Sequence, residues 1–354
     1  MTFSNHPRSV IVTGGAAASI YLAIAAITVI NVFGLSLRDD VFARTGQRND
    51  HVVVAAPLKT RRPNLIVAPS TSPGASSALS AASAAGKPNA NGSVAGAATK
   101  LSDAALLQTI RTIPQGVWAV DGSPAQAEQQ ARNVAAGSLQ TLIVYDIPGR
   151  DCGSYSAGGA GGDAGYQAWI DGLARGIGGR AVRVVVEPDA LGQCVTEARS
   201  NLVKYAATTL QAAGAHVYID ASQWVDAATM ADRLKAAGIA SVTGFSLNVS
   251  GYETTATTTA YGRTLSALVG GKHFVIDTSR NGAGPKGSEW CNPAGRALGV
   301  YPTTATANAL IDGLLWLKNP GESDGECTEF GHHDPAAGVW WPSYALSLGR
   351  MAGW

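Results

Sequence analysis

Aspartate and tryptophan side chains are the groups in this chain whose types and positions suggest chemistry. Hydrolysis of a glycosidic bond needs one carboxylic acid to protonate the leaving oxygen and a second carboxylate to activate water or to attack. Large apolar aromatic faces could hold the pyranose rings, although tryptophan is just as often part of a core. The candidate carboxylates are Asp151, Asp189, Asp220 and Asp324, and the candidate rings are Trp118, Trp224, Trp290 and Trp316.

Asp189 is the leading candidate because of its place in the sequence VRVVVEPDAL, residues 182–191. The β-branched run Val182–Val186 has the composition of a strand that is buried on both faces, as in parallel sheets. Pro188 cannot donate to a continuing ladder, so the strand ends before it. Asp189 would therefore lie at the carboxyl end of a buried strand, where parallel α/β folds assemble their sites.

Seven short apolar runs, separated by alanine-rich segments of helical period, follow one another after Leu101. This alternation predicts a parallel α/β fold, either a barrel or a doubly wound sheet. The predicted strands are Val117–Val120, Leu142–Tyr145, Val182–Val186, His216–Ile219, Phe245–Leu247, His273–Ile276 and Leu314–Leu317. The predicted helices include Ala164–Gly176, Thr196–Ala213 and Ala227–Ala237.

Polar residues follow six of these runs directly. They are Asp146, Glu187, Asp220, Asn248, Asp277 and Lys318. Packing alone also places polar residues after strands, so none of them is decisive by itself. Because the carboxyl ends of parallel strands meet at one edge, their joint occurrence predicts an active-site cleft there.

The overall composition limits the partners of the chain. It has 354 residues, of which 46% are hydrophobic and 14% charged, and its formal net charge is +1. These values fit one large domain with an additional unstructured part. A near-neutral chain has no basic patch for a nucleic-acid backbone, so we expect an uncharged substrate and no nucleic-acid partner.

The N-terminal third divides into two segments. Residues 9–37 contain no charged side chain and are apolar enough to span a bilayer, which takes roughly 20 such residues. Residues 1–37 are therefore predicted to be a signal anchor or uncleaved signal peptide in contact with a membrane, although a cleaved form is hard to separate from it. Residues 38–100 are rich in Ala, Ser, Pro and Gly and predict a disordered linker, which leaves 101–354 as the catalytic domain. The protein would be secreted or anchored to the outer face of the cytoplasmic membrane.

Four cysteines, Cys152, Cys194, Cys291 and Cys327, all lie in the predicted domain. An even number outside the cytosol suggests two disulfides, which would fix loops near the candidate carboxylates. The paired Cys-x-x-Cys or Cys/His spacing of a zinc site is absent, so no metal is expected. The sequence His332-His333-Asp334 is interpreted as a solvated turn.

The glycine-rich sequence SAGGAGGDAG, residues 156–165, nominally fits a dinucleotide-binding fingerprint. Such a fingerprint follows a strand directly, whereas residues 148–157 separate these glycines from the preceding apolar run. The conformational freedom of glycine favours a mobile loop over a cleft instead. No Gly-x-Ser-x-Gly elbow indicates a serine hydrolase, and no cofactor is expected.

Two sequence blocks make the resemblance to a known family specific. VYDIPGRDCGSYSAGGAGG, residues 144–162, and VVVEPDALG, residues 184–192, resemble the two signatures of glycoside hydrolase family 6 cellulases. Further matching blocks surround Asp220, Ile276, Glu289 and Leu315 in the expected order. The resemblance extends from about Leu106 to the C-terminus.

The resemblance implies a distorted (β/α) barrel of about seven parallel strands, with a tunnel or cleft across the carboxyl ends of the strands. It also implies cleavage of β-1,4-glucan with inversion by a monomer. Asp189 would be the general acid, and nearby Asp151 would keep it protonated. Asp324 would be the base, either directly or through a water chain involving Asp151 and Ser154 or Ser156. Asp220 would support the site by hydrogen bonding.

The same resemblance implies a set of sugar-binding residues, with Trp224 left in doubt because the sequence around it departs from the family pattern. They are Tyr145, Trp118, Trp290, Lys318, Glu322, Asn281, Asn292 and Ser156. The segments after Asn292 and Glu322 leave little room for a long roofing loop, which favours an endoglucanase over an exo-acting cellobiohydrolase. A catalytically inactive glycan-binding protein and a membrane-tethered structural domain are the alternatives from other classes.

Overall fold

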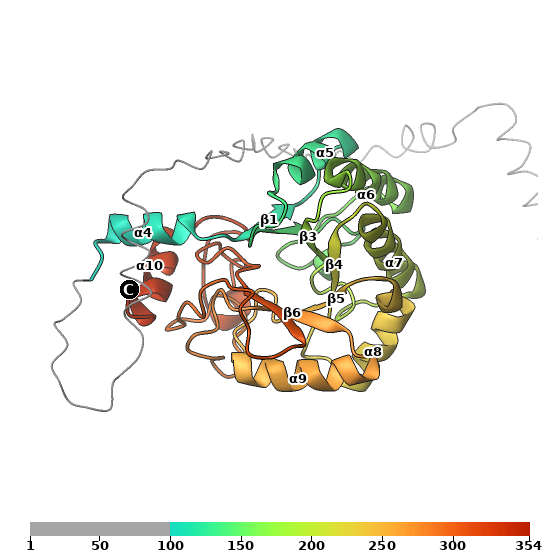
Figure 1. Cartoon of the computed structure of the whole chain (residues 1–354). Helices are drawn as coiled ribbons and strands as arrows, with labels where there is room; N and C mark the ends of the chain where they lie inside the picture. The colour runs from blue at the N-terminus through green and yellow to red at the C-terminus, as the bar shows by residue number, and fades with distance from the viewer. Residues whose placement is uncertain (1–99) are drawn as a thin grey trace, which may run out of the picture. The chain divides into compact units, whose positions relative to one another are not determined.

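The computed structural model describes residues 100–354 (Figure 1). The predicted membrane segment 1–37 and the predicted linker before Lys100 lie outside the described residues. Among the helices of residues 100–354, none is both long and apolar enough to cross a membrane.

Seven parallel strands form one sheet in chain order. They are β1 (Gly116–Ala119), β2 (Thr141–Val144), β3 (Arg183–Val186), β4 (His216–Asp220), β5 (Gly244–Leu247), β6 (His273–Asp277) and β7 (Ile311–Leu315). A doubly wound sheet would reverse its strand order part-way, so the sequential order identifies a curled barrel. The predicted fold class is confirmed, and the first six predicted strands lie within one residue of the observed bounds.

The helices are α4 (Asp103–Thr112), α5 (Pro124–Asn133), α6 (Asp163–Ile177), α7 (Glu197–Ala212), α8 (Ala227–Ala236), α9 (Thr255–Leu268) and α10 (Pro342–Met351). Helices α5 to α9 connect the strands from β1 to β6 and pack outside the sheet, whereas α4 precedes β1 and lies beside α10 (Figure 1). The starts of the helices are set by local sequence. In α5, for example, Ser123 and Gln126 form a capping box and Pro124 occupies the first turn.

The valine-rich strand β3 is buried on both faces, as its composition predicted. Alternate side chains of a strand point to opposite faces. Val184 and Val186 pack in the layer between sheet and outer helices, together with Trp169 of α6. Val185 points the other way and packs inside the barrel with Ile143 and Leu315. The sheet therefore holds the loops after its strands on a rigid, two-sided core.

The seventh strand differs from the prediction. β7 covers Ile311–Leu315, not Leu314–Leu317, and the chain leaves the ladder before Trp316. Asp277 at the end of β6 accepts hydrogen bonds from the backbone N–H groups of Leu317 (3.2 Å) and Lys318 (3.0 Å), which redirects the chain. The Gly116 N–H of β1 donates to the Trp316 carbonyl at 2.8 Å, so the two edges of the sheet meet just beyond β7.

Trp316 is part of a second hydrophobic cluster and is not a free aromatic face. It is 1% exposed and packs with Leu106 of α4 and Leu348 of α10. Its inclusion among the candidate sugar-binding rings was wrong, because apolar burial against these two helices occupies the ring.

Candidate active site

Asp189 and Asp220 lie side by side at the carboxyl ends of β3 and β4. The backbone N–H of Asp189, a residue with φ of 69°, donates to Oδ2 of Asp220 at 3.0 Å. Asp220 also accepts from the hydroxyls of Ser246 (3.1 Å) and Ser222 (3.2 Å). The carboxylate of Asp220 therefore fixes the turn that carries Asp189, which is the supporting position expected for it.

The environment of the half-buried Asp189 favours the protonated form of its carboxyl group. Burial raises the pKa of Asp189 well above its ordinary value, and the charges of Asp220, Asp151 and Asp324 raise it further. The charge of Asp151 thus raises the pKa of Asp189 in the expected direction, although burial and Asp220 have the larger influence. Burial also raises the pKa of Asp220, to about 6. The charges of the other three predicted carboxylates thus all act on Asp189.

Asp324 has the opposite environment to Asp189. Its two carboxylate oxygens lie 3.0 and 2.8 Å from Nη1 of Arg280, a fully buried side chain, and Nζ of Lys318 lies 3.4 Å away. The backbone N–H of Asn292 (3.2 Å) and the Tyr252 hydroxyl (3.3 Å) donate to it as well. Burial alone would raise the pKa of Asp324, but the charges of Arg280 and Lys318 hold it below its ordinary value.

Arg280 and Tyr252 were missed as site residues by the sequence reasoning. The Arg280 guanidinium lies 4.4 Å from the Tyr252 ring centroid, so the two side chains form one buried support behind Asp324. Arg280 lies in the block IDTSRNGAGP, which carries the family resemblance and follows β6. An arginine just after a strand that ends at the predicted cleft was the available signal.

Asp151 lies in the loop after β2, and this loop is held by several contacts. Asp151 accepts from the Ser156 backbone N–H (2.7 Å) and from the side-chain amide of Gln193 (3.2 Å). The guanidinium of Arg150 donates to the carbonyls of Ser156 (2.8 Å) and Tyr145 (2.9 Å). Ser156 therefore contacts Asp151 through its backbone.

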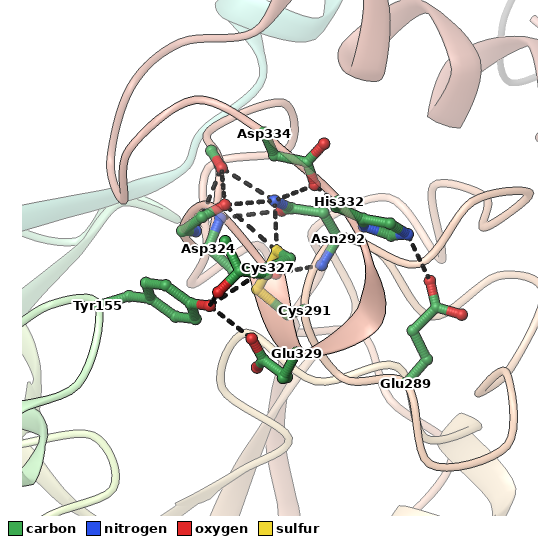
Figure 2. Close-up of a disulfide and its surroundings, with 12 residues drawn as sticks. Tyr155, Glu289, Cys291, Asn292, Asp324, Cys327, Glu329, His332 and Asp334 are labelled. Atoms are coloured by element: carbon green, nitrogen blue, oxygen red, sulfur yellow. Dashed lines mark hydrogen bonds and ion pairs between the residues drawn. A yellow bond between two sulfur atoms is a disulfide. The ribbon is translucent and has the colours of Figure 1, made fainter.

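Both expected disulfides are present, and each fixes a loop that bears a candidate carboxylate. Cys152–Cys194 links the Asp151 loop to the segment after Asp189. Cys291–Cys327 links the loop before β7 to the segment after Asp324. Figure 2 shows the second disulfide beneath Asp324 and Asn292.

The turn at His332 is more enclosed than predicted. The side chain of His332 is 28% exposed, and its Nδ1 lies 3.2 Å from Asp334, whose own side chain is 13% exposed. These two residues and Cys327 bring potential metal-ligand atoms within 4.8 Å of one another. The sulfur of Cys327 is already bonded to Cys291, so this trio lacks the thiolate that a metal would need.

Two strand-end carboxylates serve the fold. The buried Glu187 accepts from the backbone N–H groups of Asp146 (3.0 Å) and Ile147 (3.2 Å) and from the Tyr166 hydroxyl (2.9 Å). Burial raises the pKa of Glu187 to about 7. Glu187 thereby connects β2, β3 and α6 below the loop of Asp151, and Asp277 has the corresponding role between β6 and β7.

A family model described as glycosyl hydrolases family 6 matches residues 79–352. This match covers most of the chain and includes all four carboxylates. The chain belongs to glycosyl hydrolase family 6.

Relatives and solved structures of family 6 agree with the sequence and the fold. Endoglucanase A of Cellulomonas fimi is 47% identical over 279 residues, which are 75% of this chain and 61% of that protein. Endoglucanase A of Thermobispora bispora is 42% identical over 238 residues, 61% of this chain and 52% of its own length. The chain thus spans between half and two thirds of these two relatives.

A similar solved structure is the endoglucanase Cel6 from Mycobacterium tuberculosis, in complex with methyl-cellobiosyl-4-deoxy-4-thio-β-D-cellobioside. It is 42% identical with a TM-score of 0.68, and the match covers 76% of this chain and 99% of that one. A family 6 enzyme of Orpinomyces sp. Y102 is 27% identical with a TM-score of 0.60, over 70% of this chain and 89% of that one. The distorted family 6 barrel is therefore the fold of this domain.

Several sugar-binding residues expected of a family 6 member lie together beside β1. Trp118 donates its indole N–H to the Leu317 carbonyl at 3.0 Å, and Tyr145 meets it edge to face at 5.3 Å between ring centroids. Nζ of Lys318 lies 6.0 Å from the Trp118 ring centroid. Glu322 is hydrogen-bonded by Asn319 at 2.9 Å, and burial raises its pKa.

Trp224 and Trp290 have the exposure that a stacking platform needs. Trp224 is 61% exposed and Trp290 is 51% exposed. The Trp224 ring lies against Gly192, three residues after Asp189, where an added Cβ would fall 2.6 Å from the indole. The shortened sequence around Trp224 therefore still places the ring beside the loop of Asp189.

Asn281 and Asn292 are buried within the protein, in contrast to the binding role expected of family 6 members. Asn281 donates to the Glu253 carbonyl at 3.0 Å and to Thr255 at 3.1 Å. Asn292 accepts from the Asp324 backbone N–H at 2.8 Å. Because these amides already have protein partners, they hold loops in place and have little left to offer a sugar.

Proposed function

We propose that this chain hydrolyses internal β-1,4-glucosidic bonds of cellulose or a related β-glucan with inversion at the anomeric carbon. The observation that carries the proposal is the contrast between two carboxyl groups of one site. Asp189 is half-buried with a raised pKa, and the charges of Arg280 and Lys318 lower the pKa of Asp324 and favour its ionised form. Environments that push two pKa values apart supply an acid and a charged partner at the same pH.

Asp189 acts as the general acid in this proposal. Its proton passes to the glycosidic oxygen while water attacks the anomeric carbon from the opposite face of the ring. The product is then the inverted anomer, and Asp189 recovers a proton from solvent.

Asp324 acts through a water chain in this proposal. A carboxylate offers roughly four lone-pair sites. Those of Asp324 already accept from Arg280, Lys318, Asn292 and Tyr252. Little capacity remains for direct removal of a proton from the attacking water, so that proton passes along a water chain by way of Asp151 and is released to solvent. The charge of Asp324 at the other end of this chain favours the transfer and stabilises the positive charge that develops on the sugar.

Endo action is favoured by the names of the more similar relatives. Four relatives that are 40–47% identical are named endoglucanases. Two that are 29% and 28% identical are named cellobiohydrolases. The four carboxylates all come from one chain, which supports action as a monomer.

The two disulfides support a location outside the cytosol, where such bonds persist. The apolar segment 9–37 supports anchoring at the outer face of the membrane or secretion.

The proposal is tested with the full chain on cellopentaose, with the first product anomer followed by ¹H NMR. The α-anomer should appear first at the new reducing end. A parallel assay on carboxymethyl cellulose should show viscosity falling early, before many reducing ends are released, as internal cleavage requires. Initial release of the β-anomer would refute inversion. Binding of cellopentaose without any cleavage would leave the glycan-binding alternative.

A further inference from the structure

Tyr155 connects two loops that are far apart in the sequence. It lies at the tip of the loop after β2, between Asp151 and Gly158. Its hydroxyl accepts a hydrogen bond from the Thr328 backbone N–H at 2.9 Å, lies 3.0 Å from the Thr328 hydroxyl, and donates to the carboxylate of Glu329. Figure 2 shows Tyr155 reaching this segment beside Asp324 and Cys327. We refer to these contacts of Tyr155 as the Tyr155 bridge.

The ring of Tyr155 also packs directly against the segment that carries Asp324. Gly325, the next residue after Asp324, has φ of 151°, and an added Cβ there would fall 2.4 Å from Cγ of Tyr155. Only glycine leaves room for the ring at this point. The bridge therefore touches the chain one residue away from a candidate catalytic carboxylate.

The opposite end of the Asp151 loop is fixed independently. Arg150 holds the base of the loop through the carbonyls of Ser156 and Tyr145, and Cys152 is bonded to Cys194. These contacts tie Asp151 to the β2 and β3 side of the barrel. None of these contacts reaches the segment of Asp324, which follows β7.

We infer that Tyr155 is a positioning residue that sets Asp151 relative to Asp324 and so aligns the water-activating side of the site. This inference rests on the proposed glucanase function and deepens it. A water chain between two carboxylates works only when both ends are held, because a displacement of about 1 Å can cost roughly 10²-fold in rate. The Tyr155 bridge supplies the link that the disulfide and Arg150 leave out.

Support of a sugar-binding ring is the competing role for Tyr155. Its ring centroid lies 6.3 Å from that of Trp290, which in turn lies 6.4 Å from Phe330. If Tyr155 served mainly to hold Trp290, its loss would weaken substrate binding and raise KM. A positioning role lowers kcat and leaves KM unchanged, so the two roles separate kinetically.

The test uses the full chain with Tyr155→Phe and Tyr155→Ala, assayed on cellopentaose and on β-cellobiosyl fluoride. Tyr155→Phe keeps the ring contact with Gly325 and loses the hydroxyl, so we expect kcat to fall roughly two- to tenfold. Tyr155→Ala loses both and should lower kcat by roughly 10²-fold. KM should stay at the wild-type value. Fluoride leaves without protonation by an acid, so each Tyr155 variant should show the same fall in kcat on β-cellobiosyl fluoride as on cellopentaose. Asp189→Asn should instead be much less impaired on the fluoride than on cellopentaose.

Two further variants serve as matched controls. Tyr205→Phe removes another tyrosine hydroxyl that donates to a carboxylate, Asp171 at 2.7 Å, on the helices outside the sheet, and should leave kcat unchanged. Glu329→Gln keeps an acceptor for Tyr155 and should lie close to wild type. Thermal unfolding of each variant shows whether the fold is intact.

Provided that the wild-type chain cleaves both substrates, three results would overturn the inference. These are an unchanged kcat in Tyr155→Ala, a loss confined to KM, and a loss on cellopentaose that disappears on the fluoride. A wild-type chain that cleaves neither substrate would instead refute the proposed function, and the inference with it.

Discussion

Replacement of Arg280 by methionine tests whether the charge of Asp324 depends on its buried guanidinium partner. The pair is 2.8 Å apart, with 0% of the Arg280 side chain and 7% of the Asp324 side chain exposed. Methionine has a similar length but neither charge nor donors. The rise that burial causes in the pKa of Asp324 would then be opposed mainly by the charge of Lys318, whose Nζ is 3.4 Å away.

The magnitude follows from the loss of an opposite charge at close range. Such a charge typically lowers a carboxyl pKa by about 1–3 units, so the pKa of Asp324 should rise by that amount, or about 1.4–4 kcal/mol. Removal of one partner of a buried ion pair typically also costs about 3–5 kcal/mol of folding stability. Both effects should therefore be large enough to measure separately.

The direction in which stability changes with pH is fixed by the folded and unfolded pKa values of Asp324. In the wild type the folded pKa of Asp324 is lowered, so its stabilising contribution is present above the unfolded value of 3.8 and is lost as the pH falls through the folded pKa. In Arg280→Met the folded pKa would be raised, so the ionised group becomes destabilising as the pH rises through it. The difference in melting temperature between wild type and variant should widen from pH 4 to pH 8.

Two measurements check this prediction. The acidic limb of kcat/KM on cellopentaose should move up by about one to three pH units in the variant. Thermal melts at pH 4 and pH 8 should show the widening difference. Arg175→Met is the control, because Arg175 pairs with Glu128 at 3.0 Å on the surface with 54% of its side chain exposed, and it should change neither profile. An acidic limb and a melting difference that both stay constant would show that Arg280 does not hold the charge of Asp324.

Three further predictions concern the acid, a buried strand-end carboxyl and a disulfide. Asp189→Asn should lower hydrolysis of cellopentaose by roughly 10²–10⁴-fold with an unchanged calorimetric Kd, and wild-type turnover would remove Asp189 as the acid. Glu187 has a folded pKa of about 7 against 4.5, so about 3 kcal/mol of stability present below pH 4.5 should disappear as the pH rises past 7. Glu187→Gln should abolish that slope in thermal melts, and a slope equal to the wild type would contradict the assignment. The double variant Cys152→Ser/Cys194→Ser frees a loop with a sequence separation of 42 residues and should lose up to about 4 kcal/mol in denaturant unfolding, so an unchanged midpoint would argue against a stabilising bridge.

Local sequence was enough to predict six of the strands, three of the helices and the place of Asp189. The run Val182–Val186 is β-branched at nearly every position, and Pro188 ends the ladder whatever surrounds it. Strand composition and helix capping are properties of neighbouring residues, so they can be identified without the fold. The end of β7 was predicted wrongly because its position depends on Asp277, a residue of another strand.

The family resemblance added the roles of the four aspartates but could not show which partners tune them. Asn281 and Asn292 matched the expected pattern, and yet both are buried with their amide groups hydrogen-bonded to other protein groups. Composition cannot distinguish an amide that faces a sugar from one that holds a loop. That distinction depends on the direction in which the side chain points.

The sequence by itself thus determined a parallel α/β fold with carboxylates at the ends of its strands, since alternating apolar runs and chain breakers act over a few residues, and the family resemblance added the barrel. Only the tertiary structure decided which groups raise the pKa of Asp189 and lower that of Asp324. Arg280 meets Asp324 across 44 residues, and Tyr155 meets Thr328 across 173. Burial and charge pairing at such separations arise only when the strands close the barrel, because a pKa depends on every group packed around the carboxyl and not on its neighbours in the chain.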